Sequence, residues 1–236
     1  MIKRYFTYDG ISSLKYDILI DSIESPTPAE ISSRQQIPFT NNTINTAEIL
    51  GYKSYERRTI TIQFQIICEN SEMAEIHLMS IKRWLMNPIN TTLYDSANTT
   101  HRYQGVCCES VVATEVQDGY ADVVATFSAN PCMANQNAVS QLNWDAINFE
   151  TDKFPALIWS VQSGDVITLE NNGIEPCGLM LNSDKTVALM VDGVEYTHPA
   201  NESYCDFLLL PGENQITVRH DGGFATLKFD WNEGVL

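Results

Sequence analysis

The sequence predicts a mainly β protein of two domains, interrupted by one amphipathic helix and one long hairpin. Three observations support this fold class. Apolar and polar residues alternate with period two in many segments of the 236-residue chain, which is typical of strands with one buried face. A single segment carries apolar residues at helical spacing. In the second half, short strand-like segments and turns alternate, which indicates a sandwich or jelly roll.

The first strands are expected to be short. Tyr5–Tyr8 is predicted as a strand that ends in a turn at Asp9-Gly10, and Leu14–Ile20 is predicted as a second strand. Further along, Arg58–Cys68 alternates isoleucine and phenylalanine with threonine and glutamine. This alternation predicts a strand with one face in the core.

The segment Ser22–Arg58 is predicted to be an extended hairpin. It holds 11 apolar residues among 37, about 30% against 44% for the whole chain, and is neither Gly/Ser-rich nor a charge run. Structureless loops this long are uncommon in compact domains. Strand-like arms predict a hairpin that lies on a neighbouring subunit, with a mobile surface loop as the alternative. The side chains expected to contact the neighbour are Ile31, Ile37, Phe39, Ile49 and Tyr52.

One helix is expected at about residues 71–86. Asn70 is a good N-cap, and Asn87-Pro88 is a stop signal. A single amphipathic helix among strands must cover a sheet or the open end of a barrel, because it cannot bury its apolar stripe alone. That stripe consists of Ala74, Leu78, Ile81 and Leu85, flanked by Ile76 and Trp84.

The first domain is expected to end at residue 134. Its remaining strands are predicted at Thr92–Tyr94, Arg102–Glu109, Val111–Val116 and Tyr120–Phe127. The last two flank Gln117-Asp118-Gly119, a hairpin signal. The polar break Ser128–Asn137 then separates a domain of residues 1–134 from a domain of residues 135–236.

The second domain is predicted to be all β, because turn residues separate eight short apolar segments. The strands are expected at Phe154–Trp159, Val166–Leu169, Cys177–Leu181, Val187–Val191, Gly193–Tyr196, Phe207–Leu210, Gln215–Arg219 and Ala225–Trp231.

Composition excludes several functions. The net charge is −16, from 14 basic and 30 acidic residues, so strong binding to phosphate backbones is not expected. An acidic surface suits a solubilising role or a channel wall along which DNA slides. No segment approaches the ~18 apolar residues of a membrane span, and the N-terminus lacks a signal peptide. We therefore expect synthesis in a cytoplasm, with the six cysteines as thiols, mostly buried.

No catalytic motif is found, so the sequence predicts a protein that is not an enzyme, with no catalytic residues, cofactor or metal. Four weaker possibilities stay open. They are a sugar-stacking platform of Trp144, Trp159 and Trp231, a calcium site of Asp145, Glu150 and Asp152, a glycosidase pair of Asp145 and Asp230, and an acid–base pair of His220 and Asp221. Core packing and a solvated acidic face are the simpler interpretations.

The segment RYFTYDGISSLKYDILI resembles the start of the distal tail proteins of siphovirus-type bacteriophages. The features that follow occur in a similar order: a long hairpin, an ITI-type strand, a helix ending in Trp84-Leu85, then Leu93-Tyr94-Asp95 and Arg102-Tyr103. GYADVVATFSANP resembles the last strand before the family's domain boundary, and FLLLPGENQITV resembles a hairpin of its second domain. The sequence Ile37–Asn42 departs from the Gly-rich hairpin tip of many relatives.

The resemblance implies a structural protein of the virion tail tip, made in the host cytoplasm. Its first domain would be a split β-barrel with a belt hairpin wrapping the adjacent subunit, and its second a galectin-like β-sandwich. Six copies would form a ring that links the tail tube protein to the tail-associated fibre or lysin protein. Receptor-binding or other baseplate proteins would dock on it, and DNA would pass through the lumen without specific binding or membrane insertion. A carbohydrate-binding protein that recognises a host glycan through the second domain is the alternative function.

Overall fold

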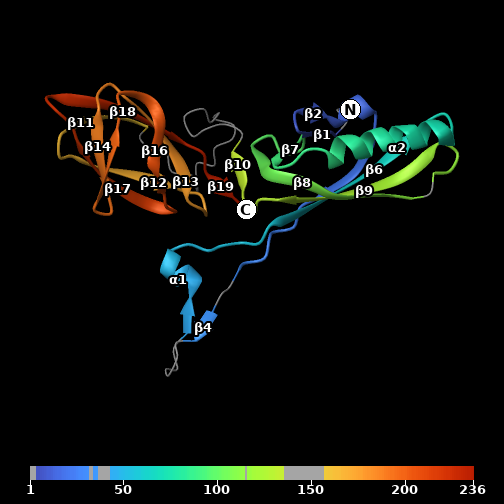
Figure 1. The fold of residues 1–236 in the computed structure, drawn as a ribbon, viewed down its shortest axis with the longest axis horizontal. Helices are drawn as coiled ribbons and strands as arrows, with labels where there is room; N and C mark the ends of the chain where they lie inside the picture. Colours follow the sequence, from blue (N-terminus) through green and yellow to red (C-terminus); the bar gives the residue numbers. More distant parts are fainter. Residues whose placement is uncertain (1–3, 32–33, 37–42, 115, 136–156) are drawn as a thin grey trace. The chain divides into compact units, whose positions relative to one another are not determined.

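The computed structural model describes residues 4–31, 34–36, 43–114, 116–135 and 157–236. The chain consists of two compact units. One comprises residues 1–45, 54–136 and 236, and the other comprises residues 46–53 and 137–235. Both are built mainly from antiparallel strands, as the sequence predicts (Figure 1).

The first unit is organised around one bent antiparallel sheet, with strand order β2-β1-β7-β8-β9-β6-β3. These strands are β1 (Phe6–Tyr8), β2 (Ile11–Ser12), β3 (Leu19–Glu24), β6 (Arg58–Ile67), β7 (Thr91–Asp95), β8 (His101–Ala113) and β9 (Tyr120–Ala129). The long strand β8 also pairs with β10 (Met133–Asn135). Its early residues pair with β7 and its later residues with β9, so β8 joins the two parts of the sheet.

Helix α2 (Ser71–Met86) covers one face of this sheet (Figure 1). The helix begins where predicted, because the side chain of Asn70 accepts a hydrogen bond from the Met73 amide at 2.9 Å. Trp84 lies at the centre of the packing, with ring centroids 5.5 Å from Phe6 and 4.5 Å from Tyr16. The buried helix residues are Ala74, Leu78, Ile81, Trp84 and Leu85, which confirms the expected apolar stripe.

The predicted strand Leu14–Ile20 is wrong over its first part. Residues Ser13–Tyr16 form a 3-10 helix, and β3 begins only at Leu19. Ser12 caps this turn through the Leu14 amide, and Asp17 ends it with φ 44°. The alternating sequence conceals a turn that side-chain caps stabilise.

The strands predicted at Arg102–Glu109 and Val111–Val116 are a single strand. In β8 the pairing with β9 shifts between Cys108 and Ser110, which marks a bulge rather than a break. The turn that follows is as expected: Asp118 and Gly119 both have positive φ, of 50° and 80°.

The second unit is a sandwich of two four-stranded sheets that share one apolar core. One sheet has the order β11 (Ile158–Gln162), β18 (Phe224–Trp231), β13 (Cys177–Ser183) and β16 (Asn201–Leu209). The other has the order β12 (Val166–Asn171), β17 (Gly212–Arg219), β14 (Val187–Val191) and β15 (Val194–His198). A short strand, β19 (Gly234–Val235), ends the chain. Each predicted strand of this domain overlaps one of these eight, although β16 begins six residues earlier than expected.

All six cysteines are free thiols. Cys132 and Cys177 are buried, and the other four are partly buried. Burial raises the pKa of Cys177 and that of Cys205 to about 12, so both thiols stay protonated at neutral pH. Among the helices that the structure describes, none is long and apolar enough to cross a membrane.

Candidate functional site

The segment of residues 22–58, called the belt hairpin below, forms two paired arms. The amide of Glu56 donates to the carbonyl of Ala29 at 2.9 Å, and the amide of Ile31 donates to the carbonyl of Ser54 at 2.8 Å. Further out, β4 (Arg34–Gln36) pairs with β5 (Thr43–Asn45). The extended hairpin predicted from the sequence is therefore present in the residues that the structure describes.

The return arm contains a short helix that sequence reasoning missed. From the Glu30–Tyr55 bridge to the Arg34–Asn45 pair, the outgoing arm advances by four residues and the return arm by ten. The extra residues accommodate α1 (Thr46–Leu50), which ends at Gly51 with φ 78°. Five residues are too few to show a helical period in the sequence. Gly51 is typical of the end of a helix and is the one signal that could have indicated α1.

The belt hairpin exposes apolar side chains. Ile31 is 48% exposed and Ile49 is 71% exposed, while Tyr52 is half-buried. Ile37 and Phe39 lie outside the described residues. Neither core cluster of the two units includes a described residue between 25 and 57. The described part of the hairpin therefore contributes little to either core.

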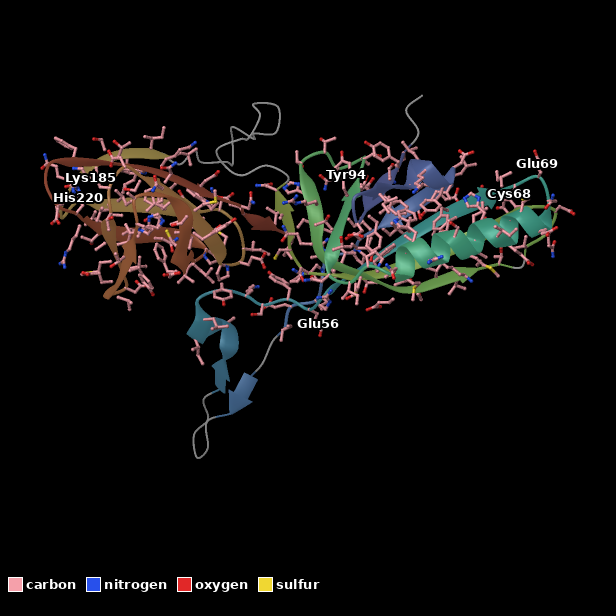
Figure 2. The ribbon with its side chains drawn as sticks, turned by 45° about the horizontal axis from the view of Figure 1, so that its top comes forward. Glu56, Cys68, Glu69, Tyr94, Lys185 and His220 are labelled. Carbon is pink, nitrogen blue, oxygen red and sulfur yellow. The ribbon has the colours of Figure 1, made fainter. Side chains whose placement is uncertain are left out.

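Two arginines fix the root of the belt hairpin to the sheet of the first unit, close to Glu56 (Figure 2). Arg57 donates to the hydroxyl of Ser128 at 2.7 Å and to the carbonyl of Gly105 at 2.6 Å. Gly105 has φ 61°, and a Cβ there would lie 2.3 Å from Asn130 Oδ1, so this position favours glycine.

Arg58 ties the two arms together at their base. It is 3% exposed, and its Nε donates to the carbonyl of Pro131 at 3.0 Å. Its Nη1 donates to the hydroxyl of Ser25 at 3.1 Å, and Ser25 is the first residue after β3. The guanidinium carbon lies 5.9 Å from the ring centroid of Tyr103. Sequence reasoning did not select this arginine, because its partners come from distant segments.

We expect Arg58→Met to lower the free energy of unfolding by about 2 kcal/mol, because the Pro131 carbonyl and the Ser25 hydroxyl lose their donor. The loss of stability is limited, because the substitution also removes the Nη2 group of Arg58, which is buried without a hydrogen bond. Urea denaturation measures the change. The matched control is Arg219→Met, which removes an exposed 3.4 Å ion pair with Glu195 and should cost less than about 0.5 kcal/mol. An Arg58→Met protein as stable as the wild type would contradict this account of the root.

The sheet face opposite α2, called the open sheet face below, is polar and acidic. Gln63 pairs with Val124, which in turn pairs with Val112, and all three are exposed. Its strands carry no described lysine or arginine, but the guanidinium of Arg57 lies at one end of the face, against Ser128. The described strand residues of this face are Leu19, Ser22, Glu24, Thr59, Thr61, Gln63, Gln65, Ile67, Cys107, Ser110, Val112, Tyr120, Asp122, Val124, Thr126 and Ser128.

The structure does not bring the candidate sugar-binding tryptophans to an open surface. Trp231 is 2% exposed in the core of the second unit, and its indole N–H donates to Glu233 at 3.2 Å. A buried ring offers no face to a sugar, so the stacking role proposed for Trp231 is wrong. Trp159 is partly buried against the same core, and Trp144 lies outside the described residues.

The other chemical candidates find no support in geometry. Asp145, Glu150 and Asp152 lie outside the described residues, so neither the calcium site nor the Asp145–Asp230 pair is described. His220 is tied to the backbone, with Nε2 3.2 Å from the carbonyl oxygen of Val161. Within the described part of the chain, no group of three or more His, Cys, Asp or Glu side chains could hold a metal ion.

A cavity of about 220 Å³ lies at the edge strands β15 and β16 of the sandwich. It is lined by Tyr196, His198, Ser203 and Tyr204, among others, and neither Trp159 nor Trp231 lines it. His198 is 4% exposed, and its Nε2 lies 2.7 Å from the hydroxyl of Ser203. These contacts stabilise the turn between the two strands.

Comparisons with known proteins agree with this fold. A family model described as a phage tail protein N-terminal domain matches residues 1–128. No curated protein sequence matches the chain. Among solved structures, the SPP1 Dit (gp 19.1) protein, described as a paradigm of the hub adsorption apparatus in phages infecting Gram-positive bacteria, is 12% identical. The match covers 99% of both chains with a TM-score of 0.65.

Two structures of the phage P2 baseplate in its activated conformation, with Ca and with Sr, also match at 9% identity. These matches cover 97% and 98% of this chain and 98% of the other, with TM-scores of 0.46 and 0.47. The family model spans more than half of the chain, and the chain shares its fold with SPP1 Dit. The chain belongs to the family of phage tail proteins that carry this N-terminal domain, and its role in the tail is structural rather than enzymatic.

Proposed function

We propose that this protein forms a hexameric ring at the distal end of the phage tail tube. The observation that carries the proposal is the belt hairpin, which has a firmly anchored root and exposed apolar side chains at Ile31 and Ile49. A hairpin that lies on the adjacent subunit makes a head-to-tail contact, in which each copy uses two different surfaces. Repetition of such a contact closes into a ring when the rotation between copies divides a full turn.

The open sheet face supports a lumen for DNA. Its described strand residues are uncharged or acidic and include Glu24 and Asp122, and the one basic side chain at its end, Arg57, is hydrogen-bonded to Ser128 and Gly105. DNA carries dense negative charge, so a wall whose strands carry no basic side chain binds it weakly. In the proposed ring this face lines the channel, and DNA passes it without specific binding.

The second unit is proposed to serve as a galectin-like docking module. On this proposal the ring joins the tail tube protein to the tail-associated fibre or lysin protein, and the sandwich holds receptor-binding or other baseplate proteins. The protein would then reside in the virion at the tail tip. The glycan-binding alternative loses its main support, because Trp231 is buried in the sandwich core.

Electron microscopy of the purified protein tests this proposal. We expect six-fold rings with a central opening, and the same rings between tube and tip in tails labelled with an antibody against the second unit. Labelling of another part of the virion, or closed particles without an opening, would contradict the assignment.

A further inference from the structure

Helix α2 carries a second apolar stripe on the side opposite its buried face. Its members recur at three- or seven-residue spacing and stay exposed in the isolated chain. They are Met73 (53% exposed), Ile76 (56%), Met79 (69%) and Met86 (50%), called the α2 stripe below. At ~100° per residue these positions spread over about 140° of the outer side of the helix, and the exposed Glu72 and Arg83 lie among them. Ile89, which is 88% exposed, follows immediately after the helix.

Four large apolar side chains exposed on the outer side of a helix indicate a surface that a partner covers. The inner face of α2 packs on the sheet of its own unit, so the α2 stripe lacks a cover within the described chain. Methionine adapts its shape to a partner readily, and it is frequent at docking surfaces. The α2 stripe therefore has the composition of an interface.

We propose that the α2 stripe of one copy is the receptor for the belt hairpin of the next copy in the ring. This inference rests on the proposed function, and it names the second surface that a head-to-tail contact requires. The belt hairpin presents Ile31, Ile49 and Leu50, which are 48%, 71% and 41% exposed. A contact between the belt hairpin and the α2 stripe buries the exposed apolar side chains of both surfaces.

The two surfaces also match in length. A helix of 16 residues is about 24 Å long, and the belt arm of residues 25–31 spans about 23 Å when extended. An arm laid along the helix can therefore contact the stripe over its whole length.

The open sheet face is a poorer receptor for the belt hairpin. Its apolar side chains, such as Val112 and Val124, alternate with polar and acidic ones. Covering the face would bury Glu24 and Asp122, and the basic side chain described at its end, Arg57, is already hydrogen-bonded to Ser128 and Gly105. The outer side of α2 carries Arg83 as well as Glu72, so exposed charges of both signs are present there.

Three variants test the inference. The stripe variant carries Ile76→Glu and Met79→Glu, and the belt variant carries Ile31→Glu and Ile49→Glu. The control is Val194→Glu, which places the same charge at a residue of β15 that is 52% exposed. We expect native mass spectrometry to find monomers for the first two variants and rings for the control. Circular dichroism should show all three folded, because every substituted side chain is exposed.

Mixing the two defective variants identifies the contact itself. The stripe variant keeps an intact belt hairpin and the belt variant keeps an intact α2 stripe, so one good interface remains between them. We expect an equimolar mixture to form a heterodimer and nothing larger. Rings formed by the stripe variant, or a mixture that contains only monomers, would overturn the inference while leaving the ring of the wild type standing. A monomeric wild type would instead contradict the proposed function, and this inference with it.

Discussion

Deletion of Ser33–Tyr52 is expected to turn the ring-forming protein into a folded monomer. The deletion removes β4, β5 and α1, whereas the core clusters include no described residue from this range. The cut lies beyond Ile31 and Ser54, whose backbones are hydrogen-bonded at 2.8 Å, so the shortened arms can still be joined. The interface is lost because Ile49 and most of the hairpin are removed.

Two measurements separate this result from unfolding. Light scattering reports the oligomeric mass, and urea denaturation reports the stability of the first unit, which should change by less than about 1 kcal/mol. Arg57 and Arg58 remain in the deleted protein and keep the root attached to the sheet. Global unfolding of the deleted protein would show that the belt hairpin is part of the core.

Substitution of Trp84 by alanine is expected to lower the free energy of unfolding by about 4 kcal/mol. Trp84 is 6% exposed, stacks on Phe6 and Tyr16, and donates its indole N–H to the carbonyl of Tyr8 at 3.4 Å. Its removal leaves a cavity between α2 and the sheet. Chemical denaturation checks the value.

The matched control is Leu14→Ala in the 3-10 helix of the same unit. Leu14 is 51% exposed and lies outside the α2 stripe, so its truncation should change stability by less than about 0.5 kcal/mol. Equal effects of the Trp84 and Leu14 substitutions would contradict the assignment of Trp84 to the centre of the core.

Elements with strong local signals were predictable from the sequence. Asn70 and the stripe from Ala74 to Leu85 locate α2, because capping and helical spacing act within one segment. The strands of the second unit are equally clear, since turn residues separate them. The 3-10 helix Ser13–Tyr16 was not predictable in this way, because its side-chain caps override an alternating pattern that suits a strand.

The candidate site was predictable only in part. A long segment of low apolar content indicated the belt hairpin, and its exposed Ile31 and Ile49 agree with a surface that awaits a partner. The anchoring role of Arg57 and Arg58 was missed, because their acceptors are 33 to 73 residues away in the chain. Trp231 shows the opposite error, in which a residue type suggested a surface role and the fold buried it.

Native mass spectrometry of the wild-type protein tests the ring most directly. A hexamer of the 26.5 kDa chain has a mass of about 159 kDa, and we expect this species to dominate at micromolar concentration. A single species of 26.5 kDa that persists at the highest attainable concentration and in the presence of tail tubes would contradict the ring.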